Sequence, residues 1–249
     1  MARKSSRKPN LDSLLRNWAY DPDGVSVRVG EGEDGRDVLH MRVDLGVLQL
    51  ETTGRPDGSR PEGFETYLDF LLSRLGPEGD EFVLNEAQCG EADREFVQYY
   101  HRRVCWLALR EFSRAVEDAD HTLALMDFCR DHSPEEQWTI SHEQYRPFVL
   151  FHRTQAQALA VLEEGGPLAS IQAINDGLAV MKALFEQYEA DEHFDDDELV
   201  KRLIESREAL REQHTAGKTL QEQLADAIAA EEYELAAKLR DQLGQKRTG

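Results

Sequence analysis

The spacing of apolar residues changes along the chain from a period of two to a helical period. Alternation of apolar and polar residues over 25–29 and 41–47, with a loop of glycines and acids between them, predicts an N-terminal β-hairpin. Leu48 and Leu50 then fall on the opposite parity, so we expect a bulge near Gly46 or burial of both faces. Two strands alone are marginal, and this ribbon should therefore pack against helices.

Helical spacing predicts most of the remaining elements. Apolar stripes indicate short helices at residues 11–18 and 64–75 and a longer helix at residues 199–213. Ser141 followed by Gln144 has the spacing of a capping box, which predicts the start of another helix at that point. The fold class that follows is mainly α (α+β), with the β-hairpin as its small N-terminal part.

Two related helical units occupy the middle of the chain. Residues 100–126 and 153–181 each have the pattern of a helix, a tight turn and a second helix, and Ala115 of the first unit matches Ala173 of the second. This pattern is similar to the tetratricopeptide repeat, although the units lie 58 residues apart and that family repeats about every 34 residues. The expected architecture for residues 81–188 is a compact TPR-like bundle of helical hairpins.

The last predicted element is a helical hairpin at residues 219–245. Thr219 and Glu222 have the spacing of a capping box, which fixes the start of its first helix. Apolar residues recur every four positions on each arm, at Leu220, Leu224 and Ile228 and then at Leu235, Leu239 and Leu243. Each arm has only about three turns, and isolated helices of that length are not stable in water. We therefore expect the hairpin to need a partner surface.

The second arm carries a recognisable motif. Its residues are Tyr233, Ala236, Ala237, Leu239, Arg240 and Asp241, preceded by two glutamates. This sequence resembles the UVR motif of the UvrB and UvrC subunits of the bacterial excision nuclease, of ClpC-type unfoldases and of McsA kinase activators. The resemblance implies a protein-docking hairpin that often pairs with another hairpin of its kind. The alternative is an amphipathic tail that packs on its own domain.

The leading functional hypothesis is a non-catalytic adaptor that docks a protein partner through this hairpin. The predicted partner-binding residues are Leu220, Leu224, Ile228, Tyr233, Leu235, Ala236, Leu239, Arg240, Asp241 and Leu243. A first alternative is a homodimer in which two hairpins form a four-helix bundle. A second alternative, implied by the resemblance alone, is an accessory factor of nucleotide excision repair or of a Clp-type protease.

The net charge of the chain restricts the kind of partner that it can bind. The chain has 29 Lys and Arg against 49 Asp and Glu, a formal net charge of −20. Such a field repels phosphate backbones, so we do not expect direct nucleic-acid binding.

Residues 1–10 form a basic tail that we expect to be flexible. Residues 189–198 hold seven acids and predict a solvated acidic linker, which with the helix up to residue 218 connects the bundle to the hairpin.

No residue pattern predicts catalysis, a metal or a cofactor. The three cysteines form no CxxC pair and the eight histidines have no zinc-site spacing, so reduced thiols and ordinary histidines are expected. No phosphate-binding glycine loop or nucleophile motif occurs. The sequence has no apolar run long enough for a membrane span and no signal-peptide pattern, and we expect a cytoplasmic protein.

The loop of residues 52–63 is the basis of a third, enzymatic hypothesis. Arg55 and Arg60 lie beside turn glycines in residues 52–63, where they could hold an anion, although such loops are usually plain connectors. An enzyme built on this loop would need a cleft that collects both arginines and a histidine. Residues 11–80, with the β-hairpin and one helix, complete the predicted domain organisation.

Overall fold

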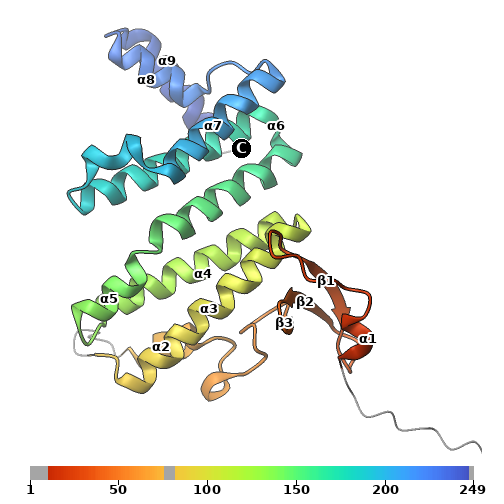
Figure 1. The fold of residues 1–249 in the computed structure, drawn as a ribbon. Helices are drawn as coiled ribbons and strands as arrows, with labels where there is room; N and C mark the ends of the chain where they lie inside the picture. The colour runs from red at the N-terminus through yellow and green to blue at the C-terminus, as the bar shows by residue number, and fades with distance from the viewer. Residues whose placement is uncertain (1–10, 76–81, 247–249) are drawn as a thin grey trace, which may run out of the picture.

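A small antiparallel sheet near the N-terminus packs on a stack of helices, and a helical hairpin projects from the opposite end (Figure 1). The computed structural model describes residues 11–75 and 82–246. The predicted basic tail, residues 1–10, lies outside this described part. The prediction of a mainly helical chain with a small N-terminal β region and a C-terminal hairpin is confirmed.

The sheet has three strands where the sequence predicted two. After the short helix α1 (Asp12–Leu15), the strands are β1 (Val27–Glu31), β2 (Asp37–Val43) and β3 (Gly46–Glu51), paired in the order β1-β2-β3. Val43 pairs with Gly46 across a tight turn, and Leu45 in that turn is 92% exposed. The predicted bulge near Gly46 was therefore wrong. The parity of apolar residues changes there because the chain reverses direction.

One face of the sheet is covered by the helices. Leu39 pairs with Leu50 across β2 and β3, and both side chains are buried with Trp106 and Ala115. Beyond the sheet, a short turn η1 (Pro61–Gly63) leads into α2 (Tyr67–Arg74). The helical part thus shields the apolar face that a three-stranded sheet cannot bury by itself.

The helices follow one another through the body of the molecule. They are α3 (Glu86–Leu109), α4 (Phe112–Asp131), α5 (Glu136–Glu143), α6 (Arg146–Gln187), the 3-10 helix η2 (Asp191–Asp196) and α7 (Glu198–His214). Packing is extensive between α3 and α4, α4 and α6, and α6 and α7. Separate apolar clusters lie between α2, α3 and α4 and between α6 and α7. The body is therefore a helical bundle built mainly from contacts between successive helices.

Helix α6 is two helical arms joined at a reversal. Gly166 has φ 76° and ψ −173°, a conformation open in practice only to glycine, and Pro167 starts the second arm. A Cβ atom placed on Gly177 would lie 2.1 Å from Oγ1 of Thr154. This contact shows that the second arm folds back closely on the first. The predicted turn between the two helices of the second unit is confirmed.

One local prediction in the bundle was wrong, and a second was incomplete. Ser141 lies inside α5, where its hydroxyl donates to the carbonyl of Trp138, so it caps no helix. The acidic segment 189–198 is not simply a solvated linker, because η2 occupies most of it and Phe194 packs on Phe185 with ring centroids 5.6 Å apart. Its last aspartate, Asp197, accepts hydrogen bonds from two backbone N–H groups and begins α7.

The chain ends in the hairpin formed by α8 (Leu220–Ala229) and α9 (Tyr233–Lys246), which stands away from the bundle in Figure 1. Within the described residues, every helix is too short or too polar to cross a bilayer.

Candidate protein-docking hairpin

Local hydrogen bonds define both the start of the hairpin and its turn. Thr219 Oγ1 accepts from the backbone N–H of Glu222 (3.3 Å), and Glu222 Oε2 accepts from the N–H of Thr219 (2.8 Å), which confirms the predicted capping box. At the turn, Glu231 has a φ of 58° and the N–H of Glu232 donates to the carbonyl of Ala227 (2.8 Å). The two helices are therefore joined by a three-residue reversal.

Small residues form the interior of the hairpin. Ala227, Ala236 and Leu239 are buried there, and Leu220 and Leu224 pack against them with part of their surface exposed. The alanines leave room for the two helices to approach closely. Because this interior is so small, it stabilises the hairpin only weakly.

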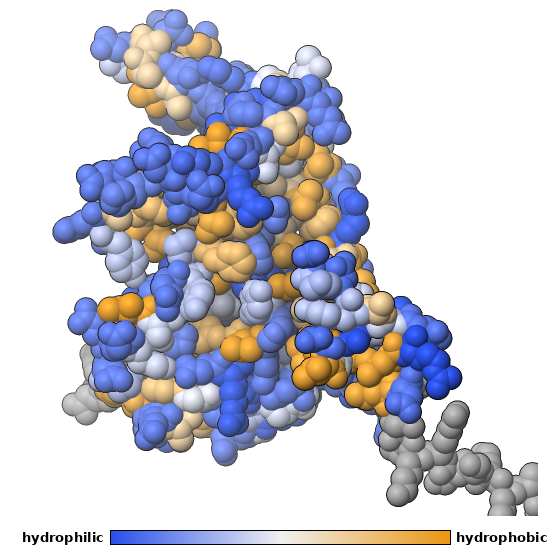
Figure 2. Space-filling model, viewed as in Figure 1, coloured by the Kyte–Doolittle hydropathy of each residue, from blue (hydrophilic) through white to orange (hydrophobic). Residues whose placement is uncertain are grey.

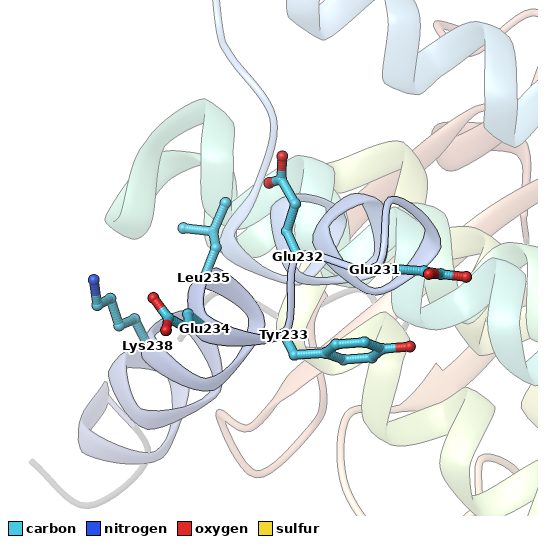
Figure 3. A pocket seen from close by; sticks show the side chains of 6 residues that line it. All are labelled: Glu231, Glu232, Tyr233, Glu234, Leu235 and Lys238. Carbon is cyan, nitrogen blue, oxygen red and sulfur yellow. The ribbon is translucent and has the colours of Figure 1, made fainter.

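Three large apolar side chains remain uncovered close to the turn. Ile228, Tyr233 and Leu235 are 55%, 68% and 44% exposed. Tyr233 and Leu235 line an open hollow of about 470 Å³ beside the turn. The side chains around this hollow project in different directions, so they do not enclose a cavity (Figure 3). Apolar residues are visible on this end of the molecule among polar ones (Figure 2). Exposed apolar groups of this kind are suited to contact with another molecule.

Acidic residues surround these apolar groups. Glu231, Glu232 and Glu234 lie at the turn beside Tyr233, with Lys238 one turn further along α9. Over residues 219–246 the hairpin carries six acidic and three basic residues. The exposed end therefore combines apolar side chains with a negative rim.

Polar contacts attach the base of the hairpin to the bundle. The Glu222 carboxylate accepts a hydrogen bond from Asn175 of α6 (3.0 Å) and forms an ion pair with Arg211 of α7. Gln172 of α6 also donates to Gln221. Burial acts to raise the pKa of Glu222, but hydrogen bonds from the Thr219 N–H, Asn175 and Arg211 lower it below its usual value. The same carboxylate thus caps α8 and fixes its position.

The ten predicted partner-binding residues fall into three groups. Ile228, Tyr233 and Leu235 are exposed, whereas Leu220, Leu224, Ala236, Leu239 and Leu243 are buried or partly buried. Arg240 and Asp241 are exposed and bond to each other at 3.0 Å. The sequence did not distinguish the exposed group from the buried group, because both have apolar residues at every fourth position. That spacing places residues on one face of a helix but does not show which part of the face is buried. Sequence reasoning also missed the anchoring contacts of Glu222, which depend on distant helices.

The two arginines of the 52–63 loop do not form an anion site together. Arg55 is 4% exposed and lies within 4 Å of the carboxylates of Asp57, Glu91 and Glu95. Arg60 is exposed and pairs with Glu65 at 2.5 Å. Since acids already neutralise both cations, the cleft that the enzymatic hypothesis requires is not formed by them.

The cysteines and histidines show no metal-binding arrangement in the part of the chain that the structure describes. Cys89, Cys105 and Cys129 are free and buried. Burial raises the pKa of the Cys105 thiol to about 12 and that of the Cys129 thiol beyond it. Thiols held in the protonated form are poor nucleophiles and poor metal ligands.

The geometry at the C-terminus defines a class of element, a small paired-helix hairpin with an exposed apolar end. Comparison with protein families identifies it: residues 218–248 match the UvrB/uvrC motif, so the hairpin is a UVR motif. No significant match was found among curated proteins or among solved structures. The similarity to tetratricopeptide repeats is supported by none of these comparisons.

Proposed function

We propose that this chain is a non-catalytic adaptor that docks a partner protein through the end of the α8–α9 hairpin. The proposal rests on one observation, the exposure of Ile228, Tyr233 and Leu235 at the turn of a UVR motif. Hairpins of this kind are often used for protein interaction. Apolar anchors such as tyrosine, set in a polar rim, are the usual energetic centre of protein interfaces.

Charge suggests what the partner surface is like. Glu231, Glu232 and Glu234 surround the apolar group, so a matching surface would be apolar at its centre and basic at its edge. A helical hairpin of another protein that carries lysines or arginines would meet both requirements. An accessory role in excision repair or beside a Clp-type protease is a narrower version of the same hypothesis.

Self-association through the hairpin is the competing proposal. Two copies meeting end to end would bring their glutamates together, and like charges at a contact are destabilising. A heterologous partner is therefore favoured over a homodimer.

Two exposed positions and one control test the proposal. Tyr233→Asp and Leu235→Asp place a charge at the proposed contact without disturbing the buried interior of the hairpin. Val180→Asp is the matched control, because Val180 is 52% exposed on α6. Leu239→Asp is a poorer probe, since Leu239 is buried and its replacement would unfold the hairpin itself.

The measurement is quantitative affinity purification from the native cell, followed by calorimetry with the purified partner. We expect the partner to be retained by the wild type and by Val180→Asp, and lost with both hairpin variants while far-UV circular dichroism is unchanged. Truncation of Tyr233 to alanine should weaken binding by about 2 kcal/mol or more, as at interface hot spots. Unaltered binding by Tyr233→Asp and Leu235→Asp would refute the proposal.

A further inference from the structure

A second hollow, remote from the hairpin turn, lies in the helical body. It has a volume of about 660 Å³ and is enclosed by α3, α4, α5 and the start of α6. Its walls are mainly apolar, with Phe96 and Tyr100 from α3, Met126 from α4 and Phe148 from α6. This size and lining are typical of pockets that hold small molecules, which range over roughly 300–1,000 Å³.

One cation, Arg103, lines this apolar pocket. Its side chain is 1% exposed, and its Nη1 donates to Oγ1 of Thr122 at 3.1 Å. Its Nε atom is buried without a hydrogen-bond partner. No carboxylate lies within 4 Å of the guanidinium in residues 11–75 and 82–246, although the neighbouring Arg102 is fully paired with Asp118. Asp118 acts on Arg103 only from beyond 4 Å and is itself paired with Arg102, so within the described residues the Arg103 guanidinium has no ion-pair partner of its own.

The charge persists at neutral pH in spite of its surroundings. Burial lowers the pKa of Arg103 to about 10, which still leaves the guanidinium protonated at pH 7. Burial, followed by the charge of Arg103, lowers the pKa of nearby His152 to about 4, so that imidazole is neutral. Burying an ion without a counter-ion is costly, and an incoming anion would offset that cost.

We propose that this pocket binds a monoanion with an apolar body, namely a hydrophobic carboxylate whose carboxyl group pairs with Arg103. The aromatic and aliphatic walls would cover the apolar part of the ligand. A single cation matches a single negative charge, and a net charge of −20 disfavours ligands with several. Arginine suits this role because its planar donors match a carboxylate. This site is independent of the hairpin and goes beyond the adaptor function.

The rim of the pocket combines one acid with exposed apolar side chains. Asp93 accepts a hydrogen bond from Trp138 (3.1 Å) and lies 2.8 Å from Nε2 of His142, so its charge is held at the edge. Val97 and Tyr145, also at the pocket, are 55% and 57% exposed. The exposed apolar side chains suit the apolar body of the ligand, whereas Asp93 at the edge would repel a second negative charge outside the pocket.

The carboxylate could belong to a free acid or to the C-terminal residue of a peptide, and the probes distinguish the two sources. Calorimetry would compare decanoate with decanol, which has the same chain length and no charge. A second pair would compare a short peptide ending in a free phenylalanine carboxylate with its amide. Tighter binding of decanoate than of the peptide acid assigns a free acid, and the reverse order assigns a peptide end.

For the wild type we expect the acid of at least one pair to bind about tenfold or more tightly than its neutral analogue, the usual effect of a hydrogen bond to a charged group. Arg103→Met should reduce this ratio to about one, and Arg103→Lys should retain part of it. Arg94→Met is the control, because Arg94 is an exposed arginine of the same helix and should leave the ratio unchanged.

A second variant keeps the proposal testable if Arg103→Met does not fold. Val97→Glu adds an acid at an exposed position of the pocket and should weaken the acid but not its neutral analogue. Equal affinities of acid and analogue in the wild type, or an undiminished preference in Arg103→Met, would overturn the proposal. Failure of all four probes to bind would overturn it as well.

Discussion

Two neighbouring arginines of α3 are both buried in the bundle but differ in the partners that their guanidinium groups contact. Arg102 is 5% exposed, and its guanidinium donates to both oxygens of Asp118 and to the carbonyls of Glu51 and Gly54. It thus joins the sheet and the following loop to α3 and α4. Arg103 is also buried, and in the described part of the chain Thr122 is its one hydrogen-bond partner. The structural value of a buried charge depends on its partners, so the two residues should respond differently to removal.

The first prediction compares the two removals directly. Arg102→Met leaves Asp118 buried without its partner, and the free energy of unfolding should fall by about 3–5 kcal/mol. Arg103→Met removes a charge that forms no ion pair with any described residue, so stability should be unchanged or higher. Urea denaturation of both variants at pH 7 measures the difference. A similar loss in both would mean that Arg103 has a structural partner.

A second prediction at the same scale concerns Gly177. A Cβ atom there would overlap Thr154 at 2.1 Å from Oγ1, so Gly177→Ala forces the two arms of α6 apart. The expected loss is about 1–3 kcal/mol, as for other overpacked sites. Gly90→Ala in α3 is the control, because the added methyl would meet nothing within 4 Å and should raise stability by about 0.5–1 kcal/mol. A stable Gly177→Ala protein would contradict the close approach of the arms.

Among the elements, those encoded by local patterns could be predicted from the sequence. The capping box of Thr219 and Glu222 was found because both partners lie within one turn of helix. The reversal at Gly166 was found because two glycines precede a proline. The same reasoning gave wrong predictions where one residue pattern is compatible with two different local structures. Ser141 and Gln144 have the capping spacing inside a helix, and Leu45 is apolar although it occupies a turn.

The candidate sites depended more on tertiary packing, and the sequence alone predicted them less well. It located the docking hairpin, but it could not show that Leu239 faces inward while Leu235 faces out. Nor does any sequence signal mark Arg103, one of two adjacent arginines in a helix, as the cation of an apolar pocket. That property appears only when the successive helices α3, α4, α5 and α6 pack against one another.

The third prediction concerns the attachment of the hairpin to the bundle through Glu222. Its pKa is lowered in the folded chain, so the contact is fully present above the ordinary value of about 4.5 and is lost as the pH falls through the lower folded value. Glu222→Gln keeps the capping spacing but loses the charge opposite Arg211. It should therefore loosen the attachment already at pH 7.

Electron–electron distance measurements between spin labels can detect this loosening. The natural cysteines are buried, so labels can be placed at Val180→Cys on α6 and Gln242→Cys on α9, both of which are exposed. We expect a narrow distance distribution for the otherwise wild-type chain at pH 7. The distribution should broaden as the pH is lowered progressively below about 4.5, or at pH 7 with Glu222→Gln. Equal widths at pH 7 with and without Glu222→Gln would show that other contacts fix the hairpin.

At the scale of the whole molecule, the hairpin is a separate small unit on a larger body. Its apolar interior of Ala227, Ala236 and Leu239 forms a cluster distinct from the three clusters of the sheet and bundle. The described hydrogen bonds and ion pair between the two parts involve polar side chains of α6, α7 and α8. Most of the stability of the body should therefore be independent of the hairpin.

The last prediction follows from this separation and from the charge of the chain. A chain truncated after residue 218 should keep the fold of its body, because it loses only a few partly exposed polar contacts worth about 1 kcal/mol. Its thermal midpoint should fall by no more than roughly 2–4 °C. In sedimentation equilibrium both chains should be monomers at about 0.05 M salt, where repulsion between acidic hairpins is least screened. A full-length dimer that dissociates on truncation would instead support the homodimer, and the exposed side chains of Ile228, Tyr233 and Leu235 would then be covered by a second copy.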